Sequence, residues 1–94
     1  MAKELFESLL STRTLKIERI ISTGQKTKEG KWLKGKRNEW VILVKGAARL
    51  RFFKDNREVK MKTGSHVVIP ANTLHRVDWT DSRRKTIWLA VHYK

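Results

Sequence analysis

The stretch that most constrains the fold is residues 64–75, which read Gly64-Ser65-His66-Val67-Val68-Ile69-Pro70-Ala71-Asn72-Thr73-Leu74-His75. A glycine turn opens this stretch, a short apolar run follows, and Pro70 closes the run at a position that a strand end tolerates. Residues 71–73 form the next turn, and a further strand is predicted from residue 75 to residue 79. Short strands separated by such close turns are typical of an all-β sandwich or barrel.

The same pattern extends outward from this stretch in both directions. Residues 47–54 show it best, because apolar Leu50 and Phe52 alternate with Arg49 and Arg51, which is the period of a half-buried strand. Asp55-Asn56 then supplies a turn, so this strand and the next should form a hairpin. The predicted strands are residues 15–22, 39–44, 47–54, 57–62, 66–70, 75–79 and 85–93, with a brief extended piece at 31–33.

The beginning of the chain has a different spacing. Leu5, Phe6, Leu9 and Leu10 recur at helical intervals, which predicts a short amphipathic helix. We therefore expect one domain over residues 1–94, with an N-terminal helical segment at 1–12 and a β-barrel at 14–93. No window is long and apolar enough for a membrane-spanning helix, and the start lacks the order of a secretion signal, so we expect a cytoplasmic protein without a membrane partner.

Composition limits the chemistry more than it identifies it. The chain has no cysteine, which excludes disulfides, thiolate metal sites and cysteine nucleophiles. Neither a G-x-S-x-G elbow nor a phosphate-binding glycine loop occurs. Lysine and arginine number 22 against nine acidic residues, for a formal net charge of +13, which would attract nucleic acid or small anions.

The stretch from Gly64 to His75 resembles the second sequence motif of the cupin superfamily, in which glycine, proline and histidine stand at this spacing. Asn72 replaces the second glycine of that motif, a mild change because asparagine tolerates positive φ. The resemblance covers roughly residues 14–93, nearly the whole chain, and implies a single-domain double-stranded β-helix, or jelly-roll barrel. The segments 39–43, 69–71, 75–77 and 88–93 look like the small stand-alone cupins of bacteria.

The first cupin motif is similar only in its second half, which comprises Glu39 and Gly46. Metal-binding cupins carry two histidines before that glutamate, and residues 32–35, Trp-Leu-Lys-Gly, offer neither. A divalent metal held by His75 and Glu39 therefore lacks the usual partners, and a standard iron or manganese dioxygenase is not expected.

The resemblance implies that Glu39 and His75 both point into the barrel. Three roles are open for them: a buried pair that satisfies itself, a site for a ligand or for proton transfer, and a metal site. Four other residues complete the expectations. His92 and Gln25 are further candidates for the pocket, Trp79 should face inward because it shares the parity of His75, and His66 should face solvent.

The sequence thus favours a small basic cupin that binds a small ligand, anionic or neutral, with or without a metal, around Glu39 and His75. It does not decide whether the protein is an enzyme. A homodimer is implied by the resemblance and is supported by the apolar strand at 40–44, where Trp40 should face away from the pocket. The alternatives are a nucleic-acid-binding module that uses the basic loops 26–37 and 83–85, and a structural protein with a plugged barrel.

Overall fold

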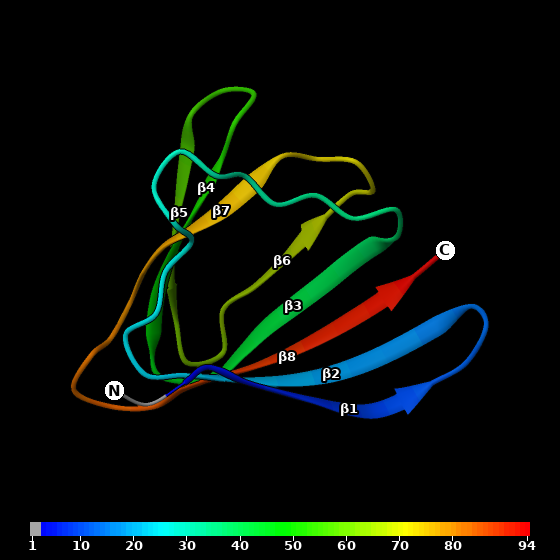
Figure 1. Ribbon diagram of the computed structural model, residues 1–94, viewed down its shortest axis with the longest axis horizontal. Coiled ribbons are helices and arrows are strands. Elements are labelled where there is room, and N and C mark those ends of the chain that lie inside the picture. The colour runs from blue at the N-terminus through cyan, green and yellow to red at the C-terminus, as the bar shows by residue number, and fades with distance from the viewer. Residues whose placement is uncertain (1–2) are drawn as a thin grey trace.

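The strands expected from the apolar alternation are present in the computed structural model, which describes residues 3–94. Along the chain they are β1 (Leu5–Ser11), β2 (Leu15–Ser22), β3 (Asn38–Lys45), β4 (Ala47–Phe52), β5 (Arg57–Lys62), β6 (His66–Ile69), β7 (His75–Thr80) and β8 (Thr86–Tyr93) (Figure 1). The brief extended piece expected near residue 32 is reduced to one bridge between Leu33 and His75. The all-β prediction is therefore confirmed.

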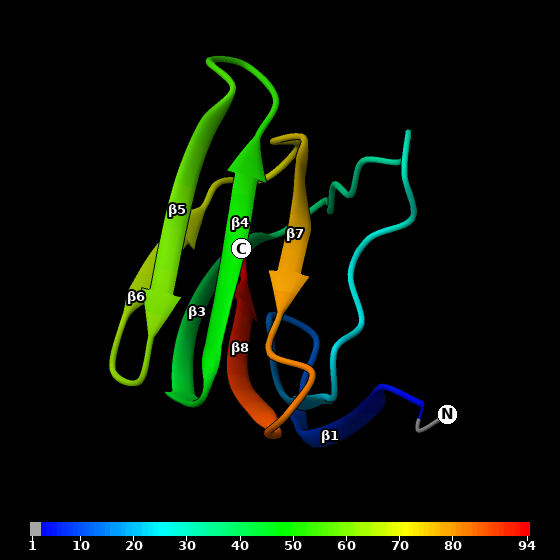
Figure 2. The same ribbon diagram turned by 90° about the vertical axis from the view of Figure 1, so that its left-hand side faces the viewer.

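The strands form two antiparallel sheets that face each other. One sheet has five strands in the order β1-β2-β8-β3-β6, and the other has three in the order β5-β4-β7. Figure 2 shows β5, β4 and β7 in front of the five-stranded sheet, with the long loop before β3 running along the open side of β7. Within residues 3–94, no helix has the length and apolar character needed to span a membrane.

The segment before the first predicted strand is itself a strand, so the expected N-terminal helix is wrong. β1 pairs with β2, placing Leu5 opposite Ile21 and Leu10 opposite Ile17, with a register shift between Ser8 and Leu10. A short isolated helix is marginal in water, whereas the free edge of β2 offers backbone partners. The bulge puts Leu5 and Leu10 on one face despite their odd spacing. Residues 1 and 2, which the expected helix included, lie outside the described residues.

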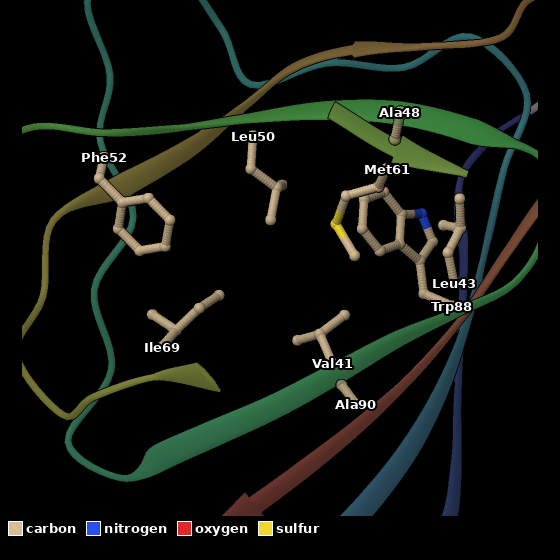
Figure 3. Close-up of a cluster of buried hydrophobic side chains, with 9 residues drawn as sticks. All are labelled: Val41, Leu43, Ala48, Leu50, Phe52, Met61, Ile69, Trp88 and Ala90. Atoms are coloured by element: carbon tan, nitrogen blue, oxygen red, sulfur yellow. The ribbon is translucent and has the colours of Figure 1, made fainter. Parts of the chain in front are cut away.

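The core lies between the sheets, because inward residues alternate along each strand. The three-stranded sheet contributes Ala48, Leu50, Phe52 and Met61, and the five-stranded sheet contributes Val41, Leu43, Ile69, Trp88 and Ala90 (Figure 3). Leu43 and Ala90 are fully buried. The indole Nε1 of Trp88 donates a 3.1 Å hydrogen bond to the hydroxyl of Ser22, so the ring is fixed in orientation as well as buried.

Gly46 is the single residue between β3 and β4, where the chain passes from one sheet to the other. Its φ of +109° lies outside the range that side chains favour. A Cβ at this position would stand 2.6 Å from the hydroxyl oxygen of Thr86 and 2.8 Å from the Thr86 Cα. Only glycine therefore fits this corner.

Candidate functional site

A cavity of about 520 Å³ opens between the two sheets. Its walls are mostly apolar side chains of both sheets: Ile20, Val41, Leu50, Ile69, Val77, Trp88 and Ala90. Polar groups lie at two places on this lining. Glu4, Glu18 and Glu39 lie on the side of the five-stranded sheet, and Lys26, Lys28 and Lys31 belong to the loop before β3. Apolar walls with a few polar groups are the usual form of a small-molecule site.

Three titratable side chains meet on the inner face of β2, β8 and β3. The Nε2 atom of His92 lies 3.4 Å from Oε1 of Glu18 and 3.5 Å from Oε2 of Glu39. Glu39 stands directly opposite His92 in the pairing of β3 with β8, and Glu18 is on the neighbouring strand β2. The imidazole therefore lies between two carboxylates, each of which can accept its proton in a hydrogen bond.

His75 begins β7 on the opposite sheet and is buried. Its Nδ1 lies 2.9 Å from the carbonyl oxygen of Thr73, which holds the proton on Nδ1 and leaves Nε2 as the acceptor of a neutral imidazole. The ring borders the main cavity and also a second cavity of about 240 Å³, which Glu39 and His92 line as well. Asn72, three residues before His75, adopts a φ of +61°, a left-handed conformation that asparagine tolerates at this glycine position of the motif.

The structure does not pair Glu39 with His75. Glu39 contacts His92 on its own sheet, whereas His75 is satisfied by the Thr73 carbonyl on the other. The expected buried pair of Glu39 and His75 is therefore wrong, because the two residues belong to facing sheets and each interacts with a partner on its own side.

The metal site that the cupin resemblance implies does not fit these residues. Among residues 3–94, no group of three or more histidine, cysteine, aspartate or glutamate side chains is arranged to hold a metal ion. The positions where the family carries its first two histidines are Trp32 to Gly35, and Trp32 instead packs edge-on against Phe53 at 5.1 Å between ring centroids. His75 and Glu39 alone are an incomplete ligand set for a metal ion.

The basic loop before β3 is tied to β7 by backbone hydrogen bonds. Thr27 N donates to the Val77 carbonyl at 2.9 Å, and Leu33 N donates to the His75 carbonyl at 2.7 Å. Arg76 adds two more ties, donating to the carbonyls of Thr27 at 2.9 Å and Lys31 at 3.2 Å. These bonds place the lysines of the loop at the mouth of the cavity.

Gln25 begins this loop and borders the cavity, as the sequence suggested. Its side-chain Nε2 donates to the Thr23 hydroxyl at 2.9 Å, and its backbone carbonyl accepts from the Thr80 hydroxyl at 2.6 Å. Gln25 therefore also fixes the start of the loop on β7.

Asp78 holds the side chain of Arg76, which in turn binds the loop before β3. Its two carboxylate oxygens accept from Arg51 at 2.7 Å and from Arg76 at 2.8 Å. Burial raises the pKa of Asp78, but the hydrogen bonds and charges of Arg51 and Arg76 outweigh burial, so that the pKa lies below its usual value. The carboxylate is held ionised between the two arginines.

The expectation that Trp79 faces inward is wrong. Its side chain is 37% exposed and lines neither cavity, while Arg49 lies over its ring at 5.2 Å from the centroid. The cause is a register shift in the pairing of β4 with β7, where Leu50 faces Val77 but Arg49 faces Trp79. The extra residue, Asp78, reverses the parity, so Thr80 takes the inward position instead.

Two cavity residues escaped the sequence reasoning although a signal for each exists. Glu18 alternates with Ile20 and Ser22 along β2, which places all three on the inner face. Trp88 has the inward parity of Ala90 on β8.

Trp40 lines neither cavity, and its ring centroid lies 5.9 Å from that of the exposed His66.

A protein from Ralstonia eutropha, described as a candidate mannose-6-phosphate isomerase, has a similar structure with a TM-score of 0.95 and 41% sequence identity, covering 100% of this chain and 87% of that one. A cupin superfamily protein from Desulfitobacterium hafniense matches with a TM-score of 0.81 at 12% identity, over 97% of this chain and 77% of that one. An RmlC-like cupin with a double-stranded β-helix fold from Methanocaldococcus jannaschii matches with a TM-score of 0.78 at 19% sequence identity, covering 97% of this chain and 80% of that one.

Comparisons with family models and with curated proteins found no match. The fold and the cavity define a small β-barrel with a ligand-sized space between its two sheets. Because the relative from Ralstonia is similar over the whole chain and both proteins share their fold with named cupins, the chain belongs to the cupin superfamily.

Proposed function

We propose that this cupin binds a small anionic, hydroxyl-bearing molecule in the cavity between its sheets. The observation that carries the proposal is the division of the polar lining, with carboxylates and His92 on one side and loop lysines on the other. The volume of about 520 Å³ falls within the usual range for small-molecule sites.

Each part of the lining suits a different part of such a ligand. Lys26, Lys28 and Lys31 are exposed at the mouth and suit an anionic group such as phosphate. The carboxylates of Glu18 and Glu39 can accept hydrogen bonds from hydroxyls. Trp88 and its apolar neighbours suit the carbon skeleton of the ligand.

A sugar phosphate combines these features and is the ligand class to test first. The relative from Ralstonia eutropha, described as a candidate mannose-6-phosphate isomerase, supports this choice. A second candidate function is isomerisation of such a sugar, which moves one proton from C2 to C1 and another from the C2 hydroxyl to the C1 oxygen. The Glu18–His92–Glu39 cluster favours it, because an imidazole held between carboxylates can take up and return a proton.

The test is calorimetric titration of the purified chain with mannose 6-phosphate, mannose and inorganic phosphate in turn. We expect the phosphorylated sugar to bind most tightly. Lys28→Gln should weaken the binding of mannose 6-phosphate about 10-fold through loss of one charged contact. Glu39→Gln should weaken the binding of both sugars, because it removes the charge of a carboxylate that accepts hydrogen bonds from their hydroxyls. Lys36→Gln is the matched control, since Lys36 lies in the same basic loop but lines neither cavity.

Absence of binding by all three compounds would overturn the proposal for this ligand class. Equal losses in Lys28→Gln and Lys36→Gln would show that general charge, rather than the cavity mouth, attracts the ligand. The second candidate function predicts that the wild type converts mannose 6-phosphate to the ketose. It also predicts that His92→Gln loses this activity.

The nucleic-acid alternative stays a prediction with its own test. Under this alternative, loops 26–37 and 83–85 bind nucleic acid, and the affinity falls steeply as the salt concentration rises. The cavity position of Lys26, Lys28 and Lys31 favours the small ligand instead. No affinity for single-stranded or duplex nucleic acid at low salt would remove the alternative.

A further inference from the structure

The outer face of the three-stranded sheet is rich in basic side chains. Residues directly opposite each other on neighbouring strands point to the same side of a sheet. Figure 2 shows β5, β4 and β7 from this side, with no other strand in front of them. The strand pairing places five basic residues of the described chain on this face: Arg49, Arg51, Lys60, Lys62 and Arg76.

Acidic neighbours neutralise only part of this charge. The carboxylates of Asp78 and Glu58 pair with Arg51 and Arg76 at distances of 2.7 to 3.1 Å between nitrogen and oxygen atoms. The ion pairs formed within residues 3–94 include none of the other three basic residues of this face. Those three therefore leave uncompensated positive charge on one end of the face.

An indole ring lies among the uncompensated charges. Trp79 stands opposite Arg49 in the pairing of β7 with β4, and Arg49 stands opposite Lys60 in the pairing of β4 with β5. The guanidinium carbon of Arg49 lies 5.2 Å from the centroid of the Trp79 ring, and Trp79 is 37% exposed. Unpaired nucleobases stack on exposed aromatic rings and guanidinium planes, while neighbouring cations neutralise their phosphates.

A second aromatic position lies at the other end of the same face. Phe53 directly follows β4, is 55% exposed, and packs edge-on against Trp32. The guanidinium of Arg76, on the outer side of β7, lies 5.8 Å from the centroid of the Trp32 ring. Phe53 is four residues beyond Arg49, the partner of Trp79, so the two aromatic positions are about 13 Å apart along the sheet. Different bases of one strand can therefore occupy them.

We propose that the outer face of the three-stranded sheet binds single-stranded nucleic acid. Bases stack on Trp79 and on the Phe53–Trp32 pair, and the three uncompensated basic residues neutralise phosphates of the same strand. The net charge of +13 draws the strand to the protein. A single strand is favoured over a duplex because stacking on a side chain needs an unpaired base. The cavity lies on the opposite side of this sheet, so a sugar phosphate and a nucleic acid can bind together.

The first test measures the fluorescence anisotropy of a labelled oligouridine of about 12 nucleotides as the full chain is added, at several salt concentrations. The wild type should bind the single strand at least about 10-fold more tightly than the same strand paired with its complement. The double variant Lys60→Gln, Lys62→Gln should reduce the slope of log affinity against log salt concentration by about 1.4, because two phosphate contacts are lost.

The double variant Lys34→Gln, Lys36→Gln is the matched control. It removes the same charge from two exposed positions in the loop before β3, away from the outer face of the strands. The salt slope of this variant should stay close to that of the wild type. The control also separates the proposed surface from the basic loop 26–37.

Substitutions of Trp79 test the stacking. Trp79→Phe keeps an aromatic ring and should hold the affinity within about 3-fold of the wild type, whereas Trp79→Leu should weaken binding about 10-fold or more. Neither change should alter the salt slope, because no phosphate contact is lost. If Trp79→Leu lacks the circular dichroism of the wild type, Phe53→Leu and Phe53→Tyr replace the two variants, since Phe53 is exposed and outside the core.

A wild type that does not bind the oligouridine at low salt would overturn the proposal. Equal effects of the two double variants would also overturn it, because general charge would then hold the strand. Full affinity in the leucine variant would exclude stacking, with the same consequence. Displacement of the strand by mannose 6-phosphate would place it at the cavity instead. Binding to phosphatidylserine vesicles but not to the oligouridine would assign the face to an anionic membrane surface and overturn the proposal.

Discussion

On the three-stranded sheet the side chains that point away from the core are mostly charged, whereas on the five-stranded sheet they are mostly apolar. β4 turns Arg49 and Arg51 outward, opposite Lys60 and Glu58 of β5. β8 turns Ile87, Leu89 and Val91 outward. Four of their six partners are apolar, and the other two are charged: Ile17, Ile21, Trp40 and Ile42 against Arg19 and Lys45. The inner faces of both sheets are alike, since each contributes apolar residues to one core.

This difference separates two kinds of sheet within one small domain. The three-stranded sheet has the alternation expected of a sheet with one solvated face. The five-stranded sheet satisfies the core with one face and presents a second apolar surface with the other. Packing within one chain therefore explains the inner face, whereas the described residues provide no cover for most of the apolar outer face.

The largest expected effect is a difference in stability between substitutions on the inner and outer faces of β3. Leu43→Ala removes a fully buried side chain and should lower the free energy of unfolding by about 2–5 kcal/mol. Ile42→Ala, one residue earlier and on the outer face, should cost about 1 kcal/mol or less at low protein concentration. Urea unfolding of both variants measures the difference.

The same experiment at high protein concentration sharpens the comparison. If the homodimer expected from the sequence forms through this face, the loss in Ile42→Ala should grow there, because a dimer adds its association energy to the stability of the fold. Equal losses for the two variants in dilute solution would show that the outer face is buried within the single chain, contrary to this comparison.

An intermediate effect is expected on the charged outer face. Asp78→Asn removes the carboxylate that joins Arg51 and Arg76 and should lower the free energy of unfolding by about 1–3 kcal/mol near neutral pH. Because the folded-state pKa of Asp78 lies below its unfolded value, this stability is present above the unfolded pKa and is lost as pH falls through the folded pKa.

The difference in unfolding free energy between wild type and Asp78→Asn should therefore shrink as acid is added. Chemical unfolding at a series of acidic pH values checks this, with Asp55→Asn as the control, since the ion pair of Asp55 with Arg57 is long, at 3.8 Å, and exposed. A constant difference across the acidic range would mean that the carboxylate charge is not the source of the stability.

The smallest effect should come from Glu7→Gln on the edge strand β1. The hydrogen bond and charge of Arg19 lower the pKa of Glu7, yet both side chains are solvated, so the free energy of unfolding of the dilute chain should hardly change. Urea unfolding of the wild type and of Glu7→Gln in dilute solution measures the change. A loss as large as that in Asp78→Asn would show that this exposed ion pair contributes more to stability than its solvation allows.

The strand pattern was predictable because its causes are local. Alternation from Ala48 to Phe52 and the turn at Asp55-Asn56 identified β4 and β5 without knowledge of their partners. The residues of β1 were misread because the spacing of Leu5, Phe6, Leu9 and Leu10 fits a helix until one bulged residue is allowed for. That bulge arises from the pairing of β1 with β2, and the local sequence pattern does not predict this pairing.

The candidate site divides in the same way. The sequence placed Glu39, His75, His92 and Gln25 at cavities that the structure contains. It could not give the partner of Glu39, because His92 is distant along the chain and becomes its neighbour only when β3 pairs with β8. It also misplaced Trp79, whose direction is reversed by the bulge at Asp78.

By itself, the sequence determined seven of the eight strands, most of their inward-facing residues and the turn that presents His75, since periodicity and turn chemistry act over a few neighbouring residues. Tertiary structure alone decided that Glu18 and Glu39 flank His92, that loop lysines reach the cavity, and that the apolar outer residues of five strands join into one surface. These features depend on strand register, which hydrogen bonds between distant segments fix only when the sheets assemble.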